Sequence, residues 1–145
     1  MKKLLLIPLL LLAVLRIATA EEFSHKVFDG YRVHYSAFNS SFISPGVASA
    51  YDIVRGKDRG LINITVVPDG VDGGRAAQVS GHVANIFAQQ QPLAFFEVRE
   101  GNAVYYLASF KFENEDSLTF NIDIKPHPDK PAQTLTFQRK FYRDK

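Results

Sequence analysis

The sequence predicts an all-β protein, an immunoglobulin-like antiparallel β-sandwich of seven to eight strands, with at most one short helix near Pro45–Ala50. Apolar and polar residues alternate with a period of two in several short segments, most regularly in residues 117–125. Gly, Pro and Asn separate these segments at short intervals, and no long helix is indicated. Short strands with frequent turns are typical of a sandwich, and a closed small barrel is the alternative.

Residues 1–20 predict a secretory signal peptide. Lys2 and Lys3 precede an apolar run from Leu4 to Leu15, and small residues end the segment at Ala20. The run of twelve residues is shorter than the roughly 20 that a bilayer span requires. We therefore expect cleavage after Ala20 and a periplasmic or secreted product. That product would be one β-sandwich domain over residues 21–145, with no stable membrane anchor.

The predicted mature chain is nearly neutral and contains no cysteine. Without Lys2, Lys3 and Arg16, 14 of the 17 basic residues remain beside 15 acidic ones. This balance gives no electrostatic reason to expect nucleic acid as a partner. The absence of cysteine excludes disulfides and a thiol nucleophile. Burial of apolar side chains must therefore stabilise the fold, and about 125 residues suffice for that.

The first half of the chain predicts three strands and one short helix. Residues 31–38 alternate, with Tyr31 and Val33 on one face of the expected strand and Arg32 and His34 on the other. Ser44 is placed to cap a helix that begins at Pro45. The many β-branched residues in 61–67 favour a strand. A further short strand is expected at residues 51–55.

The second half predicts five strands, at residues 76–87, 92–99, 103–111, 117–125 and 132–142. Short turns separate the second, third and fourth of these strands, so residues 92–125 are expected to form a three-stranded meander. Alternate residues from Val104 to Phe110 are apolar and predict the core face of a central strand. Gly81 inside its strand indicates a bulge or a close approach of backbones.

The segment from His34 to Phe42 supplies the candidate binding residues His34, Tyr35, Asn39 and Ser40. Hydroxyl and amide groups beside aromatic rings suit a polar ligand or a peptide. The same residues also suit a strand that ends in a capped turn, because Asn and Ser side chains bond to nearby backbone groups. Both interpretations remain open at this stage.

No catalytic motif is present, so we expect neither catalytic residues nor a cofactor. The sequence contains no Gly-x-Ser-x-Gly segment, phosphate-binding loop or His-Glu-x-x-His helix. The four histidines are scattered, at positions 25, 34, 82 and 127, and predict no metal site. His34 and His82 would meet only if their strands were neighbours in one sheet.

Three sequence words carry a family resemblance: VHYSAFNSSF, QVSGHVANI and LAFFEVREGNAVYYLASF. They resemble an uncharacterised gammaproteobacterial exported family that is known as a domain of unknown function, over essentially the whole mature chain. The resemblance implies a single exported bacterial domain and brings no functional residues.

We therefore expect a non-enzymatic periplasmic module that binds an envelope protein or peptide. The alternatives are an envelope enzyme that uses the region from His34 to Asn39, and a metal-handling protein built on the histidines.

Overall fold

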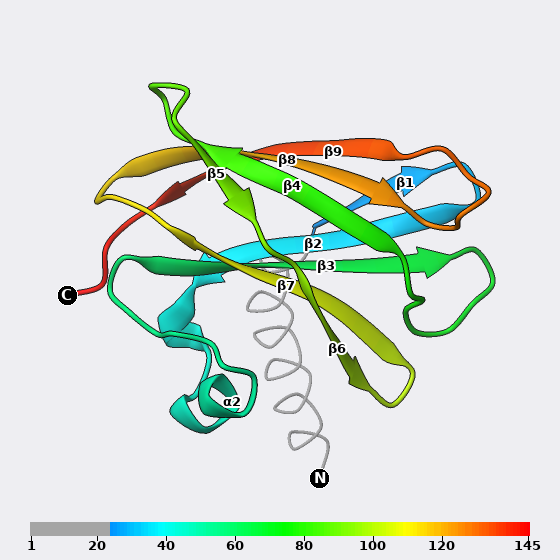
Figure 1. The fold of residues 1–145 in the computed structure, drawn as a ribbon, viewed down its shortest axis with the longest axis horizontal. Helices are drawn as coiled ribbons and strands as arrows, with labels where there is room; N and C mark the ends of the chain where they lie inside the picture. The colour runs from blue at the N-terminus through cyan, green and yellow to red at the C-terminus, as the bar shows by residue number, and fades with distance from the viewer. Residues whose placement is uncertain (1–23) are drawn as a thin grey trace, which may run out of the picture.

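The computed structural model describes residues 24–145 as two antiparallel sheets that pack face to face (Figure 1). Sheet A has the order β1 (Ser24–Phe28), β2 (Tyr31–Asn39), β3 (Arg59–Pro68), β7 (Ala103–Lys111), β6 (Phe96–Glu100). Sheet B has the order β5 (Gln90–Leu93), β4 (Gln78–Ala84), β8 (Asp116–Lys125), β9 (Gln133–Phe141). The predicted fold class, an antiparallel β-sandwich, is confirmed.

The predicted signal peptide, residues 1–20, lies outside the described residues and stays a prediction. Within residues 24–145, no helix has the length and apolar character needed to cross a membrane.

The core lies between the two sheets and is built from the alternate residues that the sequence pattern selected. Val104, Tyr106, Ala108 and Phe110 of β7 are buried, as predicted, and every second residue of β8 from Leu118 to Ile124 faces them. Phe110 packs edge to face against Phe120 and Phe141, with ring centroids 5.1 Å apart in both pairs. Both sheets therefore depend on one shared aromatic core.

A second, smaller apolar cluster covers one half of the outer face of sheet A. The chain between β2 and β3 forms η1 (Ser40–Phe42) and α2 (Pro45–Ala50), and Figure 1 shows α2 on the side away from sheet B. Ala48 and Ile53 pack there against Leu61 of β3. The predicted cap is confirmed, because Ser44 Oγ accepts a hydrogen bond from Val47 N at 3.3 Å. Among residues 24–145, this excursion covers only part of the outer face of sheet A.

The strand prediction for residues 51–55 is wrong. Helix α2 ends at Ala50 with Tyr51 as its C-cap, Asp52 adopts a positive φ of 55°, and Ile53 packs on the sheet instead of extending along it. Ile53 is apolar because it packs against the outer face of sheet A, and not because it belongs to a paired strand.

The predicted meander is also wrong, because β6 and β7 pair in sheet A whereas β8 belongs to sheet B. Phe112 follows β7 and packs against Phe141 of β9, with ring centroids 5.2 Å apart. The chain therefore crosses the core from sheet A to sheet B at this point. Residues 92–99 likewise divide between β5 and β6 in different sheets. With β1 added, the described chain has nine strands where seven to eight were predicted.

The strand predicted over residues 76–87 is shorter, because β4 spans Gln78–Ala84 and a tight loop follows it. The close backbone approach predicted at Gly81 is present. A Cβ atom at this position would lie 2.3 Å from the Asn121 carbonyl oxygen of β8. Only glycine therefore allows β4 and β8 to approach this closely.

Candidate functional site

The structure separates the predicted binding residues His34 and Tyr35. Because side chains alternate along β2, His34 lies on the outer face of sheet A and Tyr35 points inward. The Tyr35 ring packs against Phe137 of β9, with centroids 4.5 Å apart. Of these two side chains, His34 is therefore the one presented on an open surface.

Asn39 and Ser40 make hydrogen bonds inside the chain. Asn39 Nδ2 donates to the Tyr142 carbonyl oxygen at 2.9 Å and to Asp144 Oδ1 at 3.1 Å. Ser40 is 1% exposed; its Oγ donates to the Gly56 carbonyl oxygen at 3.1 Å and accepts from Gly56 N at 3.0 Å. These bonds agree with the capped-turn interpretation, and a binding role for the two residues stays a prediction.

His34 borders a hollow of about 200 Å³ on the open half of the outer face of sheet A. The hollow lies across β2, β3 and β7, whose registers bring Ser36 opposite Asn63 and Asn63 opposite Leu107. We call it the His34 hollow, and its lining residues are His34, Tyr35, Ser36, Asn63, Thr65 and Tyr105. Sequence reasoning missed the last three because they come from strands distant in sequence from β2.

The His34 hollow contains a buried acceptor with nothing bonded to it. Asn63 Oδ1 is inaccessible to solvent and has no hydrogen-bond partner within residues 24–145. Leaving such a group unpaired costs about 1–3 kcal/mol. Most buried polar side chains in proteins are paired, so an unpaired one in a surface hollow requires an explanation. A ligand that donates a hydrogen bond to this oxygen would recover the lost interaction.

His34 is held as a neutral side chain by its surroundings. Arg32 Nε donates to His34 Nε2 at 3.2 Å, so that the second ring nitrogen carries the proton. Burial lowers the pKa of His34, and the charge of Arg32 and the neighbouring His25 lower it further. The rings of His25 and His34, on adjacent strands, lie 5.6 Å apart. At neutral pH Arg32 therefore places a fixed positive charge beside a neutral His34.

The pairing considered between His34 and His82 does not occur, because β2 and β4 belong to different sheets. The neighbour of His34 is His25, which was missed because β1 was not recognised as a strand. Within residues 24–145, no three or more His, Asp or Glu side chains gather as a metal site would require.

A profile of the domain of unknown function DUF4426 matches residues 25–144. This chain belongs to the DUF4426 family. A solved DUF4426 family protein from Pseudomonas aeruginosa PAO1 is 34% identical to it, with a TM-score of 0.77. The similarity covers 87% of this chain and 99% of that one. The predicted resemblance to an uncharacterised family is confirmed.

Two distant structures share the fold of this DUF4426 domain. FetP of uropathogenic Escherichia coli strain F11, produced in the periplasm, is 11% identical with a TM-score of 0.57, over 84% of this chain and 95% of that one. A copper-bound FetP variant is also 11% identical, with a TM-score of 0.58. The similarity covers 83% of this chain and 95% of that one. At this identity the likeness shows the fold alone. No functionally curated protein matches the sequence.

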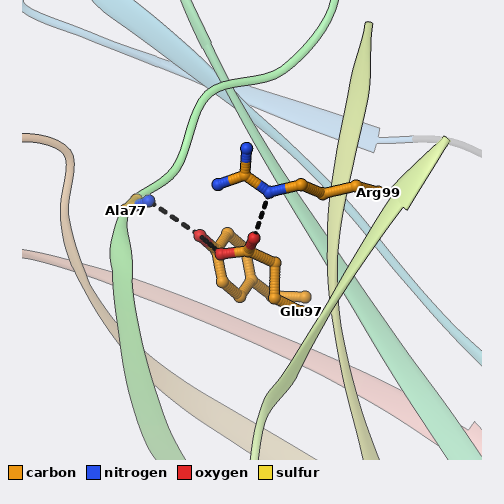
Figure 2. A network of polar contacts seen from close by, with 4 residues as sticks. Ala77, Glu97 and Arg99 are labelled. Carbon is orange, nitrogen blue, oxygen red and sulfur yellow. Dashed lines mark hydrogen bonds and ion pairs between the residues drawn. The ribbon is translucent and has the colours of Figure 1, made fainter. Parts of the chain in front are cut away.

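A second polar cluster of the DUF4426 domain has its groups paired (Figure 2). Tyr106 Oη donates to Glu97 Oε2 at 2.9 Å and accepts from Ala77 N at 2.8 Å, while Arg99 Nε donates to Glu97 Oε1. Hydrogen bonds from Arg99 and then Tyr106 lower the pKa of Glu97, and burial raises the pKa of Tyr106. The cluster joins β6 and β7 to the chain entering β4, which is a structural role.

Proposed function

We propose that this DUF4426 domain is a non-enzymatic periplasmic binding module that holds a polar group of an envelope protein or peptide in the His34 hollow. The buried, unpartnered Asn63 Oδ1 is the observation that carries the proposal. The predicted signal peptide supports the periplasmic location.

The size of the His34 hollow favours one side chain over a whole small molecule. Sites for small molecules commonly enclose about 300–1,000 Å³, whereas this hollow has about 200 Å³. A side chain or a single peptide group of a larger partner fits that space. The rest of the partner would lie along the open outer face of sheet A.

The chemistry of the lining favours an amide group. Asn63 Oδ1 requires a donor, and although the surface of the hollow is mostly apolar, the lining residues Ser36, Thr65 and Tyr105 each carry a hydroxyl that can donate to an acceptor. A side-chain amide of Asn or Gln, or a backbone peptide group, carries both functions. A carboxylate would interact with Arg32 but would place an acceptor beside Asn63 Oδ1, and an ammonium would be repelled by Arg32.

The proposal is tested by NMR titration of the mature protein with blocked amino acids, the N-acetyl methylamides of Gln, Glu, Lys and Leu. We expect the Gln derivative to shift backbone signals around Ser36, Asn63 and Thr65 most strongly. A millimolar dissociation constant, about −4 kcal/mol, is the scale expected for so small a contact.

The matched control is Ser80→Ala, an exposed hydroxyl on the outer face of sheet B, which should leave the titration unchanged. Equal shifts for all four derivatives, or shifts confined to residues outside the His34 hollow, would contradict the proposal.

Metal handling is a second candidate, favoured by the adjacent rings of His25 and His34 and by the copper-bound structure with the same fold. Against it, Arg32 occupies His34 Nε2 and would place its positive charge beside the ion. Calorimetric titration with copper should show no site tighter than about micromolar, or −8 kcal/mol. A tight one-to-one site lost in both His25→Ala and His34→Ala would support metal handling instead.

A further inference from the structure

The tip of the β4–β5 hairpin, residues 85–89, carries two exposed apolar side chains. Ile86 is 75% exposed and Phe87 is 77% exposed, although they are adjacent and large. Figure 1 shows this hairpin tip projecting beyond both sheets. The two side chains therefore stand clear of the body, where they make no contribution to the core.

The hairpin tip is held in one shape by Asn85. Its Oδ1 accepts from Phe87 N and Gln89 N, both at 3.0 Å, and its Nδ2 donates to Gln89 Oε1 at 2.7 Å. Ala88 adopts a φ of 60°, a conformation that non-glycine residues rarely take. A loop fixed in this way presents Ile86 and Phe87 without further loss of conformational freedom on binding, which favours affinity.

The surroundings of the hairpin tip are uncharged at its end and acidic at its base. Residues 83–96 contain no Asp, Glu, Lys or Arg. A hollow of about 270 Å³ lies beside residues 85 and 89–91 at the base. Its charged lining residues are Asp58, Glu113, Asp116 and Lys111, three acidic groups and one basic group.

We propose that the hairpin tip docks into an apolar pocket of a partner protein whose rim carries Lys or Arg. An aromatic side chain that fills a pocket is a typical anchor of an interface, and a basic rim complements the acidic base. A lipid surface is a poorer fit, because segments that insert into membranes combine apolar residues with Lys and Arg. A second copy would bring two acidic hollows together.

The test replaces Phe87 in the full chain with the photo-crosslinking residue benzoylphenylalanine, in cells. The matched control places the same residue at Phe42, which is 75% exposed and lies on η1. We expect a partner-protein adduct from position 87 and not from position 42. Mapping of the crosslinked peptide should show apolar residues next to Lys or Arg.

The purified partner then decides the contact chemistry. Phe87→Ser should weaken its binding at least about tenfold, and Glu113→Lys should weaken it in low salt more than in high salt. An adduct with lipid only, an adduct between two copies, the same adduct from both positions, or no adduct at position 87 would overturn the proposal. Equal binding of Phe87→Ser and the unchanged protein would overturn it as well.

Discussion

Both outer faces carry polar residues, but those of sheet B bond across neighbouring strands, whereas the Arg32–His34 bond of sheet A lies within one strand. In sheet B, side chains of β9 bond across to β8. These bonds are Thr134 Oγ1 to Asp123 Oδ1 at 2.8 Å, Thr136 Oγ1 to Asn121 Oδ1 at 3.1 Å, and Gln138 Nε2 to Thr119 Oγ1 at 3.1 Å. In sheet A, Asn63 Oδ1 has no such partner within the described chain.

The difference teaches that strand register, and not composition, decides what a polar face can do. In sheet B the register places a hydroxyl opposite each carbonyl or carboxylate, so the polar groups satisfy one another. In sheet A the register places Asn63 between Ser36 and Leu107, and the amide oxygen is buried unpaired. The three cross-strand pairs of the first face satisfy one another, whereas Asn63 of the second has an interaction left to make.

The largest effect is expected in the core that the two sheets share. Phe120→Ala should lower the free energy of unfolding by about 3–5 kcal/mol, because it empties a fully buried aromatic site. Lys111→Ala, at an exposed position, should cost under about 0.5 kcal/mol. Urea unfolding curves give both values, and the reverse order would mean that the strand faces are wrongly assigned.

A smaller effect separates two serines of one segment. Ser40→Ala should cost about 1–3 kcal/mol, because it leaves the amide and carbonyl of Gly56 without their partner. Ser36→Ala, in the His34 hollow, should change stability by under about 0.5 kcal/mol. Equal losses in urea unfolding would show that Ser36 also makes a stabilising bond.

A further effect concerns pH. The pKa of His34 lies below its value in the unfolded chain, so the unfolded state takes up a proton first as the pH falls. The contribution of His34 is therefore fully present above a pH of about 6.5 and is lost as the pH falls through its lowered pKa. His34→Gln should unfold with a weaker dependence on pH in this window than Ser36→Ala. Urea unfolding at several pH values checks this. If the free energy of unfolding changes with pH equally in both variants, Arg32, His25 and burial do not lower the pKa of His34.

Much of the fold was predictable because it follows from alternation along single strands. The buried faces of β7 and β8, the cap at Ser44 and the close approach at Gly81 all depend on local sequence. The assignment of strands to sheets was not predictable in this way. Whether β8 pairs with β7 or crosses to β4 depends on how Phe112 and Phe141 meet in the core.

Of the residues that line the His34 hollow, the sequence singled out His34 and Tyr35 as binding candidates. Asn63, Thr65 and Tyr105 line the same hollow from β3 and β7, and no pattern within residues 34–40 points to them. Tyr35 is directed inward by the pleat, and Asn39 is bonded to a C-terminal segment about a hundred residues away. A site formed across three strands requires the register of those strands to be known.

The central claim is that the unpaired Asn63 oxygen gains a partner when a ligand enters the His34 hollow, whereas its counterpart on Asn121 already has one. The most direct measurement compares Asn63→Leu with Asn121→Leu for urea stability and for NMR titration with the blocked Gln derivative. Asn63→Leu should lose binding and keep its stability, because no bond of the described chain is broken. Asn121→Leu should keep binding and lose about 0.5–1.5 kcal/mol with its Thr136 bond. Retained binding in Asn63→Leu, or a greater loss of stability there than in Asn121→Leu, would contradict the account.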